Sequence, residues 1–532
     1  MGIRKALLPF IPSPILSVYY KIKRFFLGKH IFGETGNNIT AIRIIPLNDA
    51  ILKNNHINSV KIIRYLYWEN PFNVSEYGKY QYKIKEFVIN NINEIEIHFN
   101  NYGSWTLEIQ YCRDKRIVAK EIKTINIEAS EYNIAYLAAT LPVLIFLFDI
   151  WNISKKSSPT IVELERILFD YDNLPKNIFP FPLANKTELN TAYNGFNRSA
   201  QRMVSYIGML YKMNPKAKFH LYLCDHQAYF VLPFMYANKI PEKNFTVHLL
   251  SDGTGSYNCF NFAFGTDNAA KLYYNMRDVW KLAKNDAFMT GIQKWGKETY
   301  THIGCPCVSE VATSKSIVEQ LANRFAYSYV MTNENPNFEL ILHDINLLKG
   351  NHKVLNEMTN RVHNIDFTEG KRAVFEHNSE LCKLLGFKKQ PFEDSCKLGK
   401  KICILLGNFP LSENYEKYIE KTVSFFGQEY DYYLKDHPWV VDDEQRIQNL
   451  KNKGIKTLNS RIPTEIYMML DSKVYLAGYL SSTFLSVSLL DNPAEQVLSI
   501  WDTKKRITST TCFNFVAKTA MNIENNAVVI YD

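Results

Sequence analysis

The sequence lacks any apolar run long enough to cross a bilayer. Its longest such run, residues 134–148 (IAYLAATLPVLIFLF), has 15 residues and contains Pro142, whereas a membrane-spanning helix needs about 20 residues. We therefore interpret this run as a buried core helix. The sequence also contains no Walker loop, zinc-binding helix motif or nucleophile elbow, and no internal repeat is apparent.

Cysteine is scarce and its positions are scattered. Nine cysteines among 532 residues, an odd number in a long chain, do not form a disulfide framework. Cys224 and Cys403 end apolar, strand-like runs, where a thiol behaves as a small hydrophobic group. This usage predicts a reducing compartment. The close pair Cys305 and Cys307 has no second pair or histidine cluster beside it, so we expect no metal site there.

Charge of one sign is in excess only at the amino terminus. The chain has 62 Lys and Arg against 53 Asp and Glu, a net charge of +9. Residues 1–30 hold six Lys and Arg and no acid, so the rest of the chain is nearly balanced. This distribution argues against a broad nucleic-acid surface and favours local attraction to an anionic surface.

The amino-terminal segment also has an amphipathic pattern. Apolar residues from Ile15 to Phe26 recur at steps of three and four, with basic residues between them. Such a helix lies in a membrane interface, or packs on the protein with a solvated basic face. A secretory signal is disfavoured by three prolines in residues 6–20. We predict that residues 1–38 associate peripherally with the cytoplasmic face of a bacterial inner membrane.

The length of the chain predicts at least two hydrophobic cores. Residues 39–130 alternate short apolar runs with polar breaks, as strands do. Two strand-like runs, 218–224 and 245–250, flank a helical stretch at 227–238, which is a βαβ pattern. We expect loops from 155 to 200 around one helix at 161–169, and mostly helices from 270 to 395.

The second half of the sequence alternates strand and helix patterns more clearly. The predicted strands are 402–406, 430–434, 473–477 and 496–500, and the predicted helices are 412–426, 442–453, 463–470 and 482–490. This alternation is typical of a doubly wound parallel sheet. The polar stretch 392–401 (FEDSCKLGKK) resembles a linker. The predicted fold class is therefore α/β, with two Rossmann-like domains facing a cleft, at 39–395 and 396–505, and an extension at 506–532.

Residues that directly follow parallel strands face the ligand crevice of such a domain. Four places carry polar groups of this kind. They are Ser251-Asp252-Gly253 after the strand at 245–250, Lys435-Asp436-His437-Pro438 after the strand at 430–434, Ser481-Ser482 between a strand and an apolar helix, and Glu465 in the first turn of a helix. Taken singly, a tight turn, a helix cap or the helix dipole explains most of them.

The order and spacing of these motifs resemble the bacterial sialyltransferases of glycosyltransferase family 80. The resemblance covers about residues 217–262 and 400–502. It implies a GT-B type glycosyltransferase that transfers sialic acid from CMP-sialic acid, with inversion, to a terminal sugar of a surface glycan such as lipooligosaccharide or capsule. It also implies that residues 39–395 bind the acceptor and residues 396–505 bind the CMP-sugar.

The resemblance also implies roles for individual residues. His437 would stabilise the departing CMP phosphate, Ser481 and Ser482 would bind that phosphate, and Glu465 would hold the cytidine or ribose. Lys435, Pro438 and Gly407 would complete the nucleotide-sugar site. No cofactor is implied, because the donor substrate carries the transferred group. The Asp170-Tyr171-Asp172 sequence could suggest a metal-dependent nucleotide-sugar site, but we interpret it as a solvated helix end.

The chain departs from the family pattern at the expected base. The family has two acids before the glycine, and the first is the base; here Ser251 holds that position and Asp252 follows it. A serine accepts no proton at neutral pH without a base of its own. We predict that Asp252 replaces it, beside Gly253, with Asp225 or His226 on the acceptor side as alternatives. Two other functions stay open: a transferase for another CMP-activated acid sugar such as Kdo, and a glycan-binding scaffold without a base.

Overall fold

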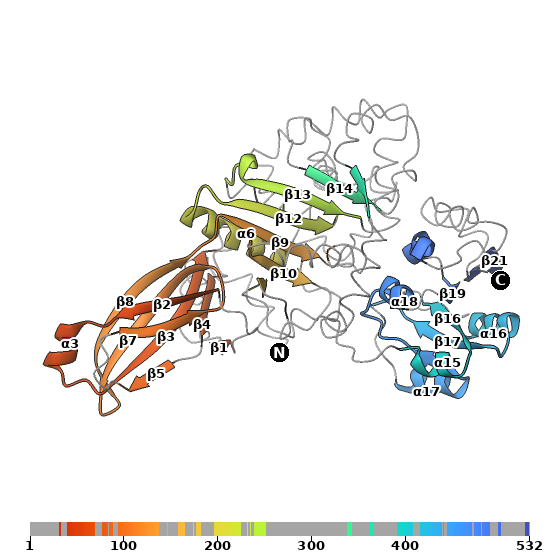
Figure 1. Cartoon of the computed structure of the whole chain (residues 1–532), viewed down its shortest axis with the longest axis horizontal. Coiled ribbons are helices and arrows are strands. Elements are labelled where there is room, and N and C mark those ends of the chain that lie inside the picture. The colour runs from red at the N-terminus through yellow and green to blue at the C-terminus, as the bar shows by residue number, and fades with distance from the viewer. Residues whose placement is uncertain are drawn as a thin grey trace, which may run out of the picture.

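The computed structural model of the chain divides into three parts that follow one another in sequence (Figure 1). Red and orange strands come first, a parallel sheet follows whose colour runs from orange-brown at β9 through yellow-green to teal-green at β14, and a teal and blue part contains the carboxy terminus. The structure describes residues 31–32, 40–69, 77–82, 85–88, 94–137, 146, 158–164, 174, 177–181, 196–224, 231, 235, 239–251, 338–342, 362–365, 391–407, 415–438, 440, 444–470, 473–479, 481–489, 498–501 and 527–530.

The first part is built of strands, as the pattern of residues 39–130 predicts; its described strands pair antiparallel, except β1 with β4, which is parallel. Its six-stranded sheet has the order β1-β4-β3-β7-β8 with β5 on β3, and β2 pairs with β6 separately. Alternate residues of β7 are buried, including Trp105, Leu107 and Ile109, because successive side chains of a strand face opposite sides of the sheet. The strands are β1 (Ile31–Phe32), β2 (Ala41–Pro46), β3 (Ser59–Glu69), β4 (Tyr77–Tyr82), β5 (Lys85–Val88), β6 (Glu94–Phe99), β7 (Gly103–Arg113) and β8 (Arg116–Ile127). A short helix, α3 (Asp49–Asn54), follows β2.

The second part is a seven-stranded parallel sheet in the order β11-β10-β9-β12-β13-β14-β15. The first strand lies inside the sheet, with the next two on one side and the following four on the other. This is the doubly wound arrangement that the sequence predicts. The strands are β9 (Glu131–Leu137), β10 (Thr160–Leu164), β11 (Ile178–Pro180), β12 (Lys218–Cys224), β13 (Phe245–Leu250), β14 (Phe338–Leu342) and β15 (Val362–Asn364). Helix α6 (Phe196–Met213) precedes β12.

Two predictions for this region are wrong. Residues 134–137 and 161–164 were expected in helices but belong to the buried strands β9 and β10. An interior parallel strand is buried on both faces, so it has a continuous apolar sequence that periodicity does not distinguish from a buried helix. Residues 270–395, expected to be mostly helical, lie largely outside the described residues, and those that are described include the strands β14 and β15.

The third part is a parallel sheet in the order β18-β17-β16-β19-β20-β21. The predicted alternation is confirmed, with one helix changed in type: residues 482–489 form a 3-10 helix, η5. Strands β18 and β21 were not predicted, and β21 places residues 527–530 inside this sheet, within the expected extension. The elements are β16 (Lys401–Leu406), α16 (Tyr415–Phe426), β17 (Tyr430–Lys435), α17 (Glu444–Asn452), β18 (Ile455–Thr457), α18 (Thr464–Leu470), β19 (Val474–Gly478), η5 (Ser482–Leu489), β20 (Leu498–Trp501) and β21 (Ala527–Ile530).

Some sequence predictions fall outside the described residues. The amphipathic segment at 1–30, most of the helix at 227–238, the Cys305–Cys307 pair and the Asp170-Tyr171-Asp172 sequence are among them. None of the helices in the described ranges is long and apolar enough to span a membrane.

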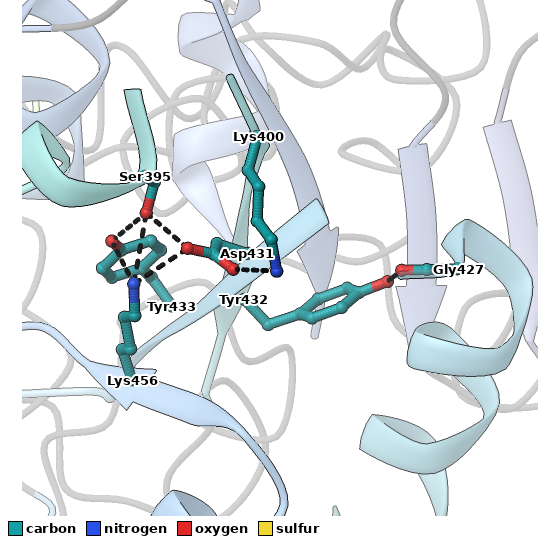
Figure 2. Close-up of polar contacts among 7 residues, drawn as sticks. All are labelled: Ser395, Lys400, Gly427, Asp431, Tyr432, Tyr433 and Lys456. Carbon is teal, nitrogen blue, oxygen red and sulfur yellow. Dashed lines mark hydrogen bonds and ion pairs between the residues drawn. The ribbon is translucent and has the colours of Figure 1, made fainter. Parts of the chain in front are cut away.

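The stretch expected to be a linker is an ordered helix of the third part. Helix α15 (Glu393–Lys397) places Ser395 in a buried position, where its hydroxyl donates a hydrogen bond to Asp431 Oδ2 at 2.7 Å and is 2.5 Å from the Tyr433 hydroxyl. Figure 2 shows that Lys400 and Lys456 approach the same carboxylate, at 3.1 and 2.8 Å. This network attaches α15 to the first residues of β17, so the carboxy-terminal unit begins before residue 396.

The Asp431 network predicts an acid-sensitive contribution to stability. Burial raises the pKa of Asp431, but hydrogen bonds from Lys456, Ser395 and Lys400 outweigh it and lower the pKa to about 2. A carboxylate with a depressed pKa stabilises the fold above its unfolded pKa near 4, and that contribution is lost as pH falls towards 2. We expect Asp431→Asn to lower the free energy of unfolding at pH 6 by about 2 kcal/mol. In urea titrations between pH 6 and 3 this difference should narrow; a difference independent of pH would contradict the prediction. Asp394→Asn, an exposed carboxylate on α15, is the control.

Candidate functional site

Three neighbouring strands of the third part, β17, β16 and β19, end at the same level of their sheet. Leu406 of β16 pairs in register with Lys435 of β17 and with Gly478 of β19. Gly407, Asp436 and Tyr479 therefore follow side by side, and His437 and Ser481 come one and two residues later. The strand order reverses between β16 and β19, the position at which doubly wound sheets bind their ligands. The structure thus brings the predicted strand-end residues to one edge of one sheet.

Two glycines allow the backbones at this edge to approach closely. A Cβ atom at Gly478, which has φ of +127°, would lie 2.4 Å from Leu406 O and 2.5 Å from Leu406 N. At Gly407 a Cβ atom would lie 2.5 Å from Asp436 Oδ1 and 3.0 Å from Asp436 Cα. Side chains at these two positions would therefore separate the strand ends that carry the candidate residues.

Lys435 and Glu465 lie beneath the edge as a buried cation and a buried acid. Lys435 Nζ donates hydrogen bonds to Asp436 O at 3.1 Å and to Ser460 O at 2.8 Å. Burial lowers the pKa of Lys435 to about 8, although the charges of Glu465 and Asp436 partly counteract it. Burial raises the pKa of Glu465, against the opposing effects of its own backbone N–H and the Lys435 charge. The described contacts of Lys435 therefore join the end of β17 to the segment that leads into α18.

The serine pair begins the 3-10 helix η5. The Ser481 hydroxyl accepts a hydrogen bond from Thr483 N at 3.3 Å and donates one to Thr483 Oγ1 at 3.2 Å, which is the usual role of a capping serine. Ser482 is the first residue of the helix and is partly exposed. Ser486 Oγ lies 3.5 Å from Glu465 Oε1, and Thr483 also hydrogen bonds Glu465. Glu465 and the serine segment thus belong to one connected group.

The His-Pro motif forms a turn at the end of β17. His437 O accepts a hydrogen bond from Val440 N at 2.9 Å, and Pro438 lies within this turn and restricts its backbone. His437 and Pro438 are both partly exposed. Sequence reasoning missed Arg446 of α17 and Tyr415 of α16, which approach Asp436 from the helices; no short-range pattern links positions so far apart.

The second part of the molecule has a comparable edge. Cys224 of β12 pairs in register with Leu250 of β13, so the chain leaves both strands at the same level. Ser251 is fully buried, and its N–H donates to Ile341 O at 2.9 Å, which extends the pairing with β14. The predicted residues Asp252, Gly253, Asp225 and His226 follow directly and lie outside the described residues. The arrowheads of β9 and β12 point towards the teal and blue part (Figure 1).

The candidate residues are hydroxyls, an imidazole, a lysine and a glutamate. Backbone N–H groups and hydroxyls at the start of a helix favour an anion, and an imidazole at the same edge donates a hydrogen bond or a proton to it. In the part of the chain that the structure describes, no three His, Cys, Asp or Glu side chains are grouped to hold a metal ion. The edge is thus suited to a phosphate group.

Several solved structures share this fold. The sialyltransferase from Photobacterium damsela has a TM-score of 0.52 and 12% identity, over 94% of this chain and 98% of its own. The GT-B domain of the Photobacterium damselae sialyltransferase has a TM-score of 0.52 and 14% identity, over 75% and 99%. A 2,6-sialyltransferase from Photobacterium sp. JT-ISH-224, in a ternary complex with CMP and lactose, has a TM-score of 0.51 and 14% identity, over 94% and 97%. No protein-family model and no curated protein sequence matches the chain.

These structures establish the fold of the chain as GT-B. The resemblance to bacterial sialyltransferases, predicted from the strand-end motifs, is confirmed at the level of fold. The whole-protein matches cover more of this chain than the GT-B domain does, so the likeness extends beyond the two parallel sheets. Fold alone does not specify the reaction, which must be argued from the residues at the two edges.

Proposed function

We propose that this chain is an inverting sialyltransferase that moves sialic acid from CMP-sialic acid to a terminal sugar of a bacterial surface glycan. The observation that carries the proposal is the placement of His437, Ser481 and Ser482 at one edge of the carboxy-terminal sheet, beside its switch point. The fold shared with a 2,6-sialyltransferase crystallised with CMP and lactose supports it.

The residues have separate roles in the proposed reaction. The attacking sugar hydroxyl loses a proton to Asp252 and forms a bond to the anomeric carbon of the sialyl group. The bond from that carbon to the phosphate oxygen of CMP breaks, and the oxygen keeps the electron pair. His437 and the two serines stabilise the charge on this phosphate, and a donor placed in this way contributes about 3 to 4 kcal/mol to the transition state. The direct displacement inverts the configuration, and the assigned steps use no metal.

The donor assay tests the function and its alternatives. Purified protein is mixed with CMP-sialic acid, with and without a galactose-terminated acceptor, and release of CMP is measured. Acceptor-dependent release with a sialylated product is the expected result. Product formation only with CMP-Kdo would assign the protein to the related transferase. Binding of CMP with no turnover of either donor would favour a glycan-binding scaffold, for which Ser251 at the position of the family's base is the supporting observation.

Glu465→Gln tests the nucleotide-binding role of the buried acid. We expect the affinity for CMP to fall about 10- to 100-fold, because a hydrogen bond to a charged group is worth roughly 1.5 to 3 kcal/mol. Isothermal titration calorimetry measures the affinity. The melting temperature should change little, because two effects oppose each other. Removing a buried carboxylate stabilises the fold, and weakening the attraction to Lys435 destabilises it. Glu416→Gln, on exposed α16 surface, is the control. Unaltered CMP affinity would leave Glu465 with a structural role only.

The amino-terminal segment suits an acceptor that is linked to a lipid. We propose that residues 1–30 hold the enzyme on the inner face of the cytoplasmic membrane, supported by their basic charge and apolar spacing. In flotation with anionic vesicles at low salt, the full chain should bind and a chain without residues 1–30 should not. Binding should decrease as salt screens the charges. Equal binding of both chains would refute this location.

A further inference from the structure

An ion pair lies directly beside His437 and has no part in the roles assigned above. Asp436 is buried, and one guanidinium nitrogen of Arg446, Nη2, donates to both of its carboxylate oxygens at 2.8 and 2.6 Å. Arg446 lies in the first turn of α17, the helix that follows the turn containing Pro438. Both side chains are largely shielded, with 15% and 10% exposure for Arg446 and Asp436. At such exposure an ion pair is screened weakly by solvent and holds its geometry.

The arginine of this pair is itself fixed by an aromatic residue. Arg446 Nη2 donates a hydrogen bond to the Tyr415 hydroxyl at 3.0 Å, and the guanidinium lies over the Tyr415 ring, 5.1 Å from its centroid. Tyr415 is the first residue of α16 and is buried. The end of β17 and the starts of α16 and α17 therefore meet at this one guanidinium group.

The backbone on both sides of His437 is held as well. Asp436 O, in the peptide group that precedes His437, accepts a hydrogen bond from Lys435 Nζ, and His437 O, in the group that follows, accepts one from Val440 N. On its other side the Asp436 side chain packs against Gly407, where no Cβ atom fits. His437 thus sits between two anchored peptide groups, and the carboxylate of its neighbour cannot move without breaking the ion pair.

We infer that Asp436 and Arg446 are positioning residues that set the direction of the His437 imidazole towards the leaving phosphate. The inference rests on the proposed function. It also explains why a charged residue is buried between a strand end and a helix, since a pair of this kind contributes more to a defined geometry than to stability. Small displacements of a catalytic group cost large factors in rate. Loss of the pair should therefore affect the chemical step more than nucleotide binding.

The test is a cycle of variants measured on the full chain. Arg446→Ala and Asp436→Ala should each lower kcat about 10- to 100-fold while CMP affinity changes less than about threefold, and the double variant should be no worse than either alone. In the His437→Ala background, Arg446→Ala should lower kcat no further, because its effect passes through the imidazole. A further loss there equal to that in the wild type would overturn the inference.

A second readout does not depend on turnover. The ³¹P NMR shift of bound CMP should move in His437→Ala, move in the same direction in Arg446→Ala, and move no further when the two changes are combined. Lys453→Ala is the matched control, because Lys453 joins the end of α17 to α16 through Glu416 and Glu420 on the exposed surface; its kcat and ³¹P shift should equal the wild type. If the ³¹P shift changes of His437→Ala and Arg446→Ala add in the double variant, the positioning role is rejected, and the proposed function is not affected. A wild type that binds CMP and transfers no sugar rejects the proposed function, while the ³¹P cycle still decides the positioning of His437.

Discussion

Asp252→Asn is expected to lower the rate of sialyl transfer about 100- to 10,000-fold, because a positioned general base supplies an acceleration of this size. An asparagine has nearly the same shape as aspartate but accepts no proton from the attacking hydroxyl. Initial rates of CMP release with a saturating acceptor measure the effect. CMP affinity should stay nearly constant, since the proposed nucleotide site lies on the other parallel sheet.

The same experiment distinguishes the alternatives at the edge of the second sheet. Asp225 and His226 follow Cys224 in the sequence, and Cys224 pairs in register with Leu250, one residue before Ser251 and two before Asp252. If Asp252→Asn turns over at the wild-type rate, the base is Asp225 or His226, and the corresponding Asp225→Asn and His226→Gln variants identify which. His437→Ala is the reference for a variant that slows departure of the CMP phosphate. In this variant the affinity for the acceptor should equal that of the wild type.

Gly478→Ala is expected to destabilise the carboxy-terminal domain by about 3 to 5 kcal/mol, close to the largest values seen for single substitutions. The new Cβ atom would lie 2.4 and 2.5 Å from the backbone O and N of Leu406, and a strand backbone in the middle of a sheet cannot move aside as a flexible side chain can. The φ of +127° adds strain for any residue with a Cβ atom. Urea unfolding followed by tryptophan fluorescence measures the change.

A matched glycine separates the two causes. Gly454 has φ of +75°, and a Cβ atom there meets nothing within 4 Å. Gly454→Ala should therefore cost only about 1 kcal/mol, the backbone part of the effect. If Gly478→Ala and Gly454→Ala unfold at the same urea concentration, close packing of β19 against β16 is not what requires glycine at 478.

The regions that the sequence predicts well are those in which local pattern and burial agree. Strands β12 and β13 have the predicted bounds, and β16 and β17 differ from them by one residue at most. Turn and capping residues mark where these strands end, so the positions of His437 and Ser481 relative to a strand could be inferred. Strands β18 and β21 were missed because they are short, with three and four residues, and carry little periodic signal.

The candidate site was predictable only in part. That His437, Ser481 and Gly407 follow parallel strands can be inferred from sequence, and the edge they share follows from the geometry of a parallel sheet. By contrast, the hydrogen bond from Lys435 to Ser460 O and the packing of Arg446 and Tyr415 around Asp436 depend on contacts between elements. No spacing rule predicts these contacts, because the partners are brought together by the packing of helices on the sheet.

The sequence alone thus determined the α/β class of the chain, the alternation in its second half and the strand ends that carry polar groups, since these follow from periodicity and from turn residues. The tertiary structure decided that residues 134–137 and 160–164 are strands, that the strands are ordered around β9 and β16, and that residues 527–530 complete the last sheet. The reason is physical: an apolar segment adopts the conformation that its neighbours can bury and hydrogen bond, and those neighbours are distant in the chain.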